Sequence, residues 1–177
     1  MKEIETKILE INKNQIEAAL IRLGAKRVFD GEIETSFFDF KDGTIIKAKD
    51  LLRLRKEEDK VELTYKKVHV TQTAKVAQEF SVEVSDLETM KQILAFLGLS
   101  QIETMLKHRT SYTLDKARLD IDRYEGKYSY IPEFLEIEAE TAASIHKYAT
   151  LLGFSNKDCL PWSTQDLINY YSTKKPK

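Results

Sequence analysis

The stretch Glu3-Ile4-Glu5-Thr6-Lys7 decides our expectation of the fold. Successive side chains of a β-strand point to opposite faces of the sheet, so the two glutamates and the lysine of this strand share one face. For this strand alone, the simplest interpretation is a sheet whose charged face lies in water. The same alternation returns in most β-like stretches of the chain. The repeated pattern therefore needs a common explanation.

The other alternating stretches carry charges of like sign in pairs. The pairs are Arg53 with Arg55, Glu79 with Glu83, Lys107 with Arg109, Asp120 with Asp122 and Glu136 with Glu138, while Glu62, Thr64 and Lys66 alternate in the same way. Closed barrels with a charged interior give this pattern, as do flat sheets with one wet face. Paired carboxylates suit Mg²⁺ or Mn²⁺, and paired cations suit phosphate oxygens. A metal–polyphosphate site needs both kinds of pair.

These residues resemble the CYTH domains, or triphosphate tunnel metalloenzymes, a family that includes class IV adenylyl cyclases, thiamine triphosphatases and inorganic tripolyphosphatases. The opening E-x-E-x-K is matched by Glu3, Glu5 and Lys7. Five further motifs follow in the family's order, at residues 52–55, 63–66, 107–109, 121–122 and 136–138. The resemblance covers roughly residues 1–170. It implies an α+β fold with an antiparallel, roughly eight-stranded β tunnel, or barrel, whose lumen is charged and whose helices flank it.

The resemblance also implies roles for individual residues. The metal ligands for Mg²⁺ or Mn²⁺ would be Glu3, Glu5, Asp122, Glu136 and Glu138. The triphosphate would be bound by Lys7, Arg53, Arg55, Lys66, Lys107 and Arg109. Lys7 and Glu5 would be catalytic. Carboxylates would repel a triphosphate unless divalent metals lay between them, and without metal their crowding is expected to raise some of their pKa values.

Several charged residues keep a second interpretation. Without the other motifs, Arg53 and Arg55 would be interpreted as an exposed β face. We expect Glu79 and Glu83 to pair with lysines of the tunnel wall.

A salt bridge with Arg118 is the favoured role of Asp120, although it could also be a metal ligand. His108 alternates away from its neighbouring cations and is expected on the opposite face. Trp162 and Tyr170 could cover a substrate ring, but packing in the core or as a cap is favoured.

Composition fits one catalytic domain over residues 1–172 with a disordered tail at 173–177. With 32% charged and 42% hydrophobic residues and a net charge of −1, the chain lacks the overall positive field of a nucleic-acid-binding protein. The single Cys159 permits no internal disulfide, which suits a reducing compartment. We therefore expect a cytoplasmic monomer or homodimer that acts on a small triphosphate and binds neither nucleic acid nor membrane.

Helices are predicted from apolar stripes and end signals. One helix should follow Asn12 and end at Gly24, a second should run from Ser85 or Asp86 to Gly98, and a third from Thr141 to Gly153. A capping box at Ser163 and Asp166 predicts a last helix through Tyr171. Residues 41–50 and 125–133 are expected to be loops at the barrel mouths.

Two function classes remain open at this point. An enzyme of this family would act on ATP, thiamine triphosphate or tripolyphosphate, either as an adenylyl cyclase that forms cyclic AMP and pyrophosphate or as a triphosphatase. The alternative is a non-catalytic module that binds polyphosphate or nucleotide. The carboxylate pairs argue against that alternative, because a simple anion binder does not need them. The charged strand faces also disfavour a lipocalin-like carrier of apolar ligands.

Overall fold

The computed structural model of the chain describes residues 4–70 and 75–174. Its strands form one eight-stranded sheet in the order β1-β8-β7-β6-β2-β3-β4-β5. The strands are β1 (Ile4–Ile8), β2 (Lys26–Phe40), β3 (Leu51–Glu57), β4 (Lys60–Val70), β5 (Lys75–Val84), β6 (Leu99–Leu114), β7 (Ala117–Tyr124) and β8 (Phe134–Ala139). The α+β class and the eight-stranded antiparallel sheet are confirmed. Among the described residues, hydrogen bonds leave the sheet open, with β1 and β5 at its two ends.

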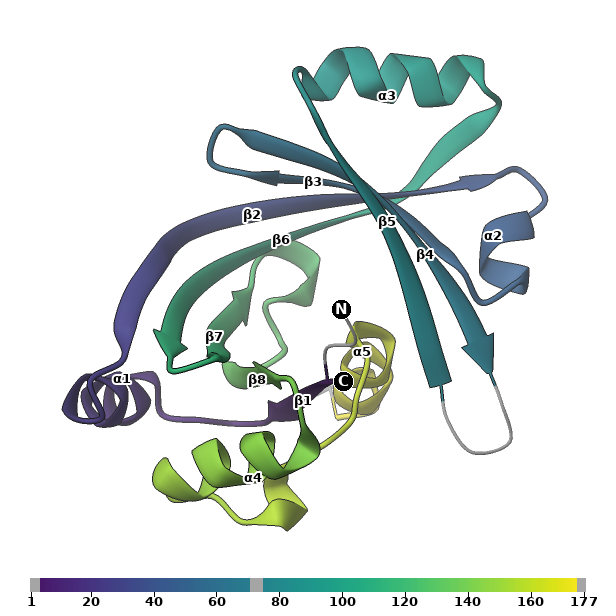
Figure 1. Cartoon of the computed structure of the whole chain (residues 1–177). Coiled ribbons are helices and arrows are strands. Elements are labelled where there is room, and N and C mark those ends of the chain that lie inside the picture. The colour runs from purple at the N-terminus through teal and green to yellow at the C-terminus, as the bar shows by residue number, and fades with distance from the viewer. Residues whose placement is uncertain (1–3, 71–74, 175–177) are drawn as a thin grey trace. The chain divides into compact units, whose positions relative to one another are not determined.

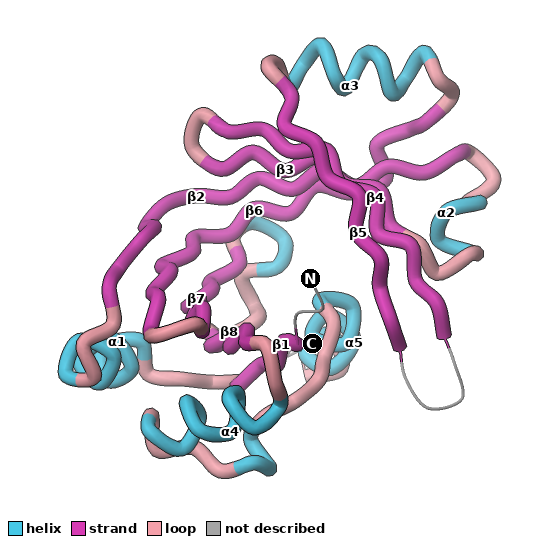
Figure 2. Tube along the Cα trace, in the orientation of Figure 1, coloured by secondary structure: helices cyan, strands magenta, loops and turns pink. Residues whose placement is uncertain are grey.

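The helices fall in the gaps between these strands. They are α1 (Lys13–Arg22), α2 (Thr44–Lys47), α3 (Leu87–Phe96), α4 (Ala142–Leu151) and α5 (Thr164–Ser172), with short 3₁₀ turns at Gly126–Tyr128 and Asn156–Asp158. The chain divides into two compact units. We call residues 1–31 and 107–177 the end unit and residues 32–106 the middle unit. Strands β2 and β6 contribute to both units (Figure 2).

The apolar faces of β1, β6, β7 and β8 form the core of the end unit together with α1 and α4. Leu119, Leu135 and Ile137 are fully buried there, against Leu20 of α1 and Ala149 of α4. Figure 1 shows α4 beside β8 and β1, which it contacts. Because side chains alternate along a strand, this packing directs the charged residues of the same strands to the other face.

Polar caps set the starts of the four longer helices at the predicted places. The side chains of Asn12, Asp86 and Thr141 each accept a backbone N–H from the first turn of α1, α3 and α4. Ser163 and Asp166 form the expected reciprocal capping box of α5. All four helices are thus confirmed, and the polar caps satisfy donors that a helix cannot satisfy itself.

The middle unit contains β3, β4 and β5 side by side, with α3 following β5 (Figure 2). Its core contains Phe38, Leu52, Leu54 and Leu94. The short helix α2 lies within the expected loop at residues 41–50. It is held by Asp39, whose buried carboxylate accepts the backbone N–H groups of Phe40, Ile45 and Ile46.

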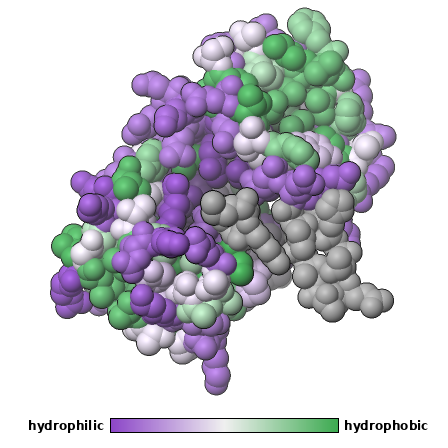
Figure 3. Space-filling model, in the orientation of Figure 1, coloured by the Kyte–Doolittle hydropathy of each residue, from purple (hydrophilic) through white to green (hydrophobic). Residues whose placement is uncertain are grey.

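Helix α3 leaves much of its apolar surface exposed. Only Leu94 of this helix is fully buried, while Phe96 is 89% exposed and Ile93 and Leu97 are also open to solvent. Figure 3 shows hydrophobic residues gathered on the surface at α3. Across the described ranges, no helix combines the length and apolar character needed to cross a membrane.

Candidate functional site

The charged residues of the end unit lie in register across four neighbouring strands. In the strand register, Lys7 of β1 stands opposite Glu136 of β8, which in turn stands opposite Asp120 of β7. Two residues earlier on β1, Glu5 stands opposite Glu138 of β8. Directly opposite residues of an antiparallel pair share a face, so the alternation seen in each strand adds up to one continuous ionic face.

Arg109 and Asp122 form the centre of this face. The guanidinium of Arg109 binds Asp122 through two hydrogen bonds of 2.6 Å, from Nε to Oδ1 and from Nη2 to Oδ2. The amino group of Lys107 donates to Asp122 Oδ2 at 2.8 Å. Asp122 is fully buried and Arg109 is 5% exposed. A planar two-point contact with a second cation on the same carboxylate gives a strongly directed arrangement.

Lys7 links this centre to β8 and β1. Its amino nitrogen lies 3.0 Å from Glu136 Oε2 and 3.3 Å from Glu5 Oε1. Glu136 Oε1 also lies 3.6 Å from Arg109 Nη2, so the carboxylate of Glu136 bridges two cations. The backbone of Lys7 exchanges hydrogen bonds with Leu160, which covers the outer edge of β1 at this point. Lys7 is therefore fixed on both its backbone and its side chain.

Asp120 takes the salt-bridge role that was favoured for it. Arg118 Nε lies 3.0 Å from Asp120 Oδ1, and Arg109 Nη1 also donates to this carboxylate. Asp120 is 2% exposed, whereas the Arg118 side chain is 41% exposed. Asp120 thus holds the guanidinium of Arg109 from a second direction.

Ionisation of these groups differs from the sequence-based expectation. Burial alone would raise the pKa of Asp122, but Lys107 and Arg109 outweigh it and hold the pKa well below the usual range. Lys7 and Arg109 likewise lower the pKa of Glu136 against the effect of burial. The prediction of raised carboxylate pKa values is wrong for these two residues, because each carboxylate lies among cations rather than among other carboxylates.

The cations respond to the same surroundings. Burial, together with the neighbouring charge of Arg109, lowers the pKa of Lys107 to about 8, although Asp122 and Glu136 oppose this. For Lys7, burial acts in the same direction, but Glu136 and Glu5 outweigh it and raise its pKa. Lys7 is therefore held firmly as a cation, whereas Lys107 loses its proton more easily.

The proposed metal ligands have suitable chemistry but are partly engaged. Glu5 lies on β1, Asp122 on β7, and Glu136 and Glu138 on β8, while Glu3 lies outside the described residues. Within residues 4–70 and 75–174, no three acidic, histidine or cysteine side chains are grouped closely enough to hold a metal. Carboxylate oxygens match Mg²⁺ or Mn²⁺, and Glu5, with its side chain 54% exposed, is accessible to an ion.

The middle unit carries the second set of predicted cations. Arg55 stands opposite Thr35 on one side and Glu62 on the other, while Arg53 stands opposite Thr64. The Nε of Arg55 is buried and has no hydrogen-bond partner among the described residues. A buried donor without an acceptor costs free energy, which an anionic ligand would relieve.

Two further contacts complete this face of the middle unit. Lys66 Nζ lies 2.5 Å from Glu79 Oε1, which confirms the expected lysine pairing of Glu79. The hydroxyl of Thr64 donates to Glu62 and lies 3.0 Å from the hydroxyl of Ser81. The face therefore combines charged groups with hydroxyls, whereas the end unit uses charged groups almost alone.

One aromatic cluster was not found from the sequence. Phe134 stacks on Tyr124 with ring centroids 5.9 Å apart, and Tyr124 contacts Tyr128 edge-on at 6.2 Å. Phe134 stands opposite Asp122 in register, so these rings close one end of the ionic face. Trp162 and Tyr170 pack edge-on against each other at 5.0 Å, in line with the favoured packing role.

Known proteins resemble this chain in sequence and in fold. The family model described as "CYTH domain" matches residues 1–151. This chain belongs to the CYTH domain family. A Methanocaldococcus jannaschii protein named "Putative adenylate cyclase MJ0240" is 30% identical over 138 residues, which cover 78% of this chain and 77% of that protein.

Solved structures support the same fold. The PH1012 protein of Pyrococcus horikoshii is 27% identical, with a TM-score of 0.75 over 93% of this chain and 98% of that one. A Hippeastrum protein named "Putative adenylyl cyclase HpAC1", described as having a dominant triphosphatase activity, is 14% identical, with a TM-score of 0.62 over 100% of this chain and 98% of that one. At that identity, the second likeness concerns the fold alone.

Proposed function

We propose that this CYTH protein is a divalent-metal-dependent enzyme that acts on a small triphosphate. The single observation that carries the proposal is the ionic face of the end unit, where Arg109, Lys107 and Lys7 converge on Asp122 and Glu136. Replacing buried ion pairs by apolar residues is often neutral or stabilising, so fold stability does not require so many buried charges. Binding of a charged ligand and a metal would account for these buried charges.

Each unit carries its own set of cations proposed to donate to triphosphate oxygens. The set of the end unit is Lys7, Lys107 and Arg109, and the set of the middle unit is Arg53, Arg55 and Lys66. Asp120 and Asp122 orient the guanidinium of Arg109 before any ligand arrives. Pre-oriented donors lose less conformational entropy on binding and stabilise developing charge without reorganisation.

The carboxylates would hold the metal. Glu5, Glu136, Glu138 and Asp122 are the proposed ligands among the described residues, with Glu3 as a further proposed ligand from the sequence. When bound, Mg²⁺ or Mn²⁺ would polarise phosphoryl oxygens and neutralise their charge. For Asp122 and Glu136 to bind metal, Lys107, Arg109 and Lys7 must turn to another anion, which the triphosphate supplies. Metal and triphosphate should therefore favour each other's binding.

Two reactions are compatible with this chemistry. Attack of water on the terminal phosphorus would make the protein a triphosphatase, and attack of a ribose 3′ hydroxyl on the α phosphorus would make it an adenylyl cyclase.

The deciding experiment incubates the protein with ATP, thiamine triphosphate or tripolyphosphate, with and without Mg²⁺ or Mn²⁺, and identifies products by mass. Cyclic AMP with pyrophosphate indicates the cyclase, and orthophosphate indicates the triphosphatase. Binding without any product would support the non-catalytic module instead.

Two conservative substitutions test the acidic residues. Glu5→Gln and Glu136→Gln keep the size of the side chain and remove its charge, so each should lower turnover at least about a hundredfold. Both variants should also bind Mg²⁺ or Mn²⁺ more weakly, as measured by calorimetry, while circular dichroism shows an intact fold. Glu140→Gln is the matched control, because Glu140 is exposed and directly follows β8. This variant should keep wild-type turnover. Near-normal activity of both test variants would remove these residues from the site.

A further inference from the structure

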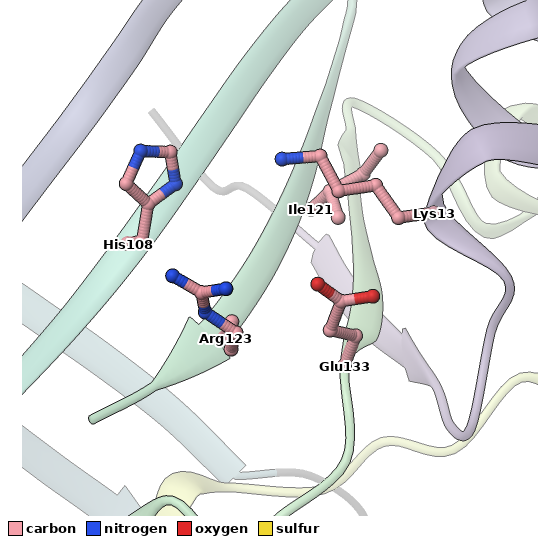
Figure 4. Close-up of a pocket in the computed structure, with 5 residues that line it drawn as sticks. All are labelled: Lys13, His108, Ile121, Arg123 and Glu133. Carbon is pink, nitrogen blue, oxygen red and sulfur yellow. The ribbon is translucent and has the colours of Figure 1, made fainter. Parts of the chain in front are cut away.

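A small polar pocket lies on the side of the end unit away from the ionic face. It encloses about 270 Å³ and is lined by Lys13, His108, Ile121, Arg123 and Glu133. Figure 4 shows Lys13 reaching from α1 over Ile121, with His108 and Arg123 across the pocket and Glu133 below Lys13. The volume is small for an organic ligand and suits a small ion with a few waters.

The pocket is separate from the proposed triphosphate residues. His108 and Arg123 stand directly opposite each other on β6 and β7. The adjacent residues on these strands, Arg109 and Asp122, also stand opposite each other. Alternating residues point to opposite faces, so the pocket opens on the face that also carries the apolar core. This placement confirms that His108 points away from Lys107 and Arg109.

Two cations of the pocket lining, Lys13 and Arg123, offer hydrogen-bond donors. Lys13 Nζ donates to the hydroxyl of Thr110 at 3.2 Å, which leaves two of its three donors for a ligand. Arg123 uses Nη2 for Glu125 at 3.2 Å, and among the described residues its other nitrogens remain for further contacts. Asp30 lies beside the pocket, where its Oδ1 is 3.5 Å from His108 Nε2 and accepts from the hydroxyl of Thr110.

The fourth polar group, Glu133, selects among anions. An ionised carboxylate only accepts hydrogen bonds and repels an anion that has no proton to donate. Hydrogenphosphate keeps one hydroxyl at neutral pH and can donate it to Glu133 while its other oxygens accept from the cations. Sulfate has the same shape but has no hydroxyl. The neighbouring carboxylate of Asp30 is engaged by His108 and Thr110, so Glu133 is the carboxylate of the pocket lining that meets the anion, and it favours phosphate over sulfate.

We propose that this pocket binds inorganic hydrogenphosphate. Lys13 and Arg123 donate to its oxygens, and Glu133 accepts from its hydroxyl, while the Nε2 of His108 faces Asp30. The inference goes beyond the proposed function and does not depend on it, because it concerns a different face of the sheet.

Calorimetric titration of the metal-free protein with phosphate, and separately with sulfate at equal ionic strength, tests this site. Phosphate should bind at least about tenfold more tightly than sulfate, because a carboxylate left facing an anion without a proton loses a hydrogen bond to a charged group. Glu133→Gln should raise the affinity for sulfate to within about threefold of that for phosphate, since an amide can donate. This gain of binding also shows that the variant is folded.

Further variants locate the binding. Lys13→Met should weaken the binding of phosphate at least about tenfold by removing a charged donor. Lys116→Met removes an exposed lysine of the same unit and should leave phosphate binding unchanged. Arg55→Ala should also leave it unchanged.

Equal affinity for the two anions in the wild-type protein would overturn the proposal. So would phosphate binding that survives Lys13→Met and is lost in Arg55→Ala, since the phosphate would then occupy the proposed triphosphate residues. That second result would leave the proposed function intact.

Discussion

The two units use charge in different ways on their ionic faces. In the end unit, Lys7 and Lys107 each have a carboxylate partner on a neighbouring strand, and Arg109 has three carboxylate partners, Asp120, Asp122 and Glu136. In the middle unit the buried Nε of Arg55 has no acceptor among the described residues, and the hydroxyls of Thr64 and Ser81 lie on the same face. The cations at the centre of the end unit are thus neutralised within it, whereas the middle unit leaves a buried hydrogen-bond donor of Arg55 for the proposed ligand.

This difference suggests a division of roles between the two sets of proposed binding residues. Groups that neutralise one another hold a fixed geometry, so the end unit should contribute most to stability and orientation. Groups with unused donors gain most from a bound anion, so the middle unit should contribute most to affinity. The predictions below test that division, from the largest expected effect to the smallest.

Removal of Arg109 should have the largest effect on stability. Arg109→Ala leaves Asp120 and Asp122 buried without their guanidinium, which should lower the free energy of unfolding by about 3–5 kcal/mol. Arg118→Ala is the matched control, because it removes a partner of the same Asp120 from a side chain that is 41% exposed. That change should cost less than about 1 kcal/mol. Urea unfolding of both variants measures the difference, and equal losses would contradict the division.

Removal of Arg55 should instead affect affinity. Arg55→Ala should weaken binding of tripolyphosphate by about 2–3 kcal/mol, or roughly 30- to 160-fold, as for a lost charge-assisted contact. Its free energy of unfolding should change little, because the guanidinium Nε makes no hydrogen bond to any part of the chain that the structure describes. Calorimetric titration without added metal measures the affinity.

Lys60→Ala is the matched control for Arg55→Ala, since it removes an exposed cation from the adjacent strand. It should bind tripolyphosphate as the wild type does. If Arg55→Ala unfolds easily but binds normally, the two units have the opposite roles to those proposed.

Metal and triphosphate should stabilise the protein cooperatively. Either ligand at a hundred times its dissociation constant should add about 2.7 kcal/mol. Both together should exceed the sum of the separate gains by about 1–2 kcal/mol, within the usual range of coupling between sites. The reason is that metal takes the carboxylates from the cations, and the triphosphate then takes the cations. Thermal melting with each ligand and with both measures the excess, and simple additivity would argue against a shared site.

Local rules of sequence predicted the elements well. Alternation along single strands placed charged and apolar residues on the right faces, and caps such as Asn12 and Ser163 marked helix starts. These features depend on neighbours within a few residues. Helix α2 was missed because its support comes from Asp39, a residue of the preceding strand whose side chain binds the helix backbone.

Interactions between strands were less predictable. Alternation gives the face of Asp122 but not its partners, which depend on the register that sets it opposite Arg109. The sequence suggested that carboxylates would crowd one another. In the folded chain cations from β6 and β1 lie between them, which reversed the expected direction of the pKa shifts of Asp122 and Glu136.

The smallest expected effect is a dependence of stability on acid pH that arises in the end unit. The folded pKa values of Asp122 and Glu136 lie below those of the unfolded chain, which are near 3.9 and 4.3. Their stabilisation is therefore fully present above about pH 5 and is lost as the pH falls towards their folded pKa values. Each group contributes at most about 1.4 kcal/mol per pH unit. Urea unfolding of the metal-free protein between pH 3 and pH 6 should show stability rising with pH and then levelling off.

Asp122→Asn should flatten this rise, whereas Glu79→Gln of the middle unit, whose side chain is 45% exposed, should leave it unchanged. A stability that instead falls as the pH rises through this range would mean that the carboxylates repel one another more than the cations attract them, and the end unit would not be internally neutralised.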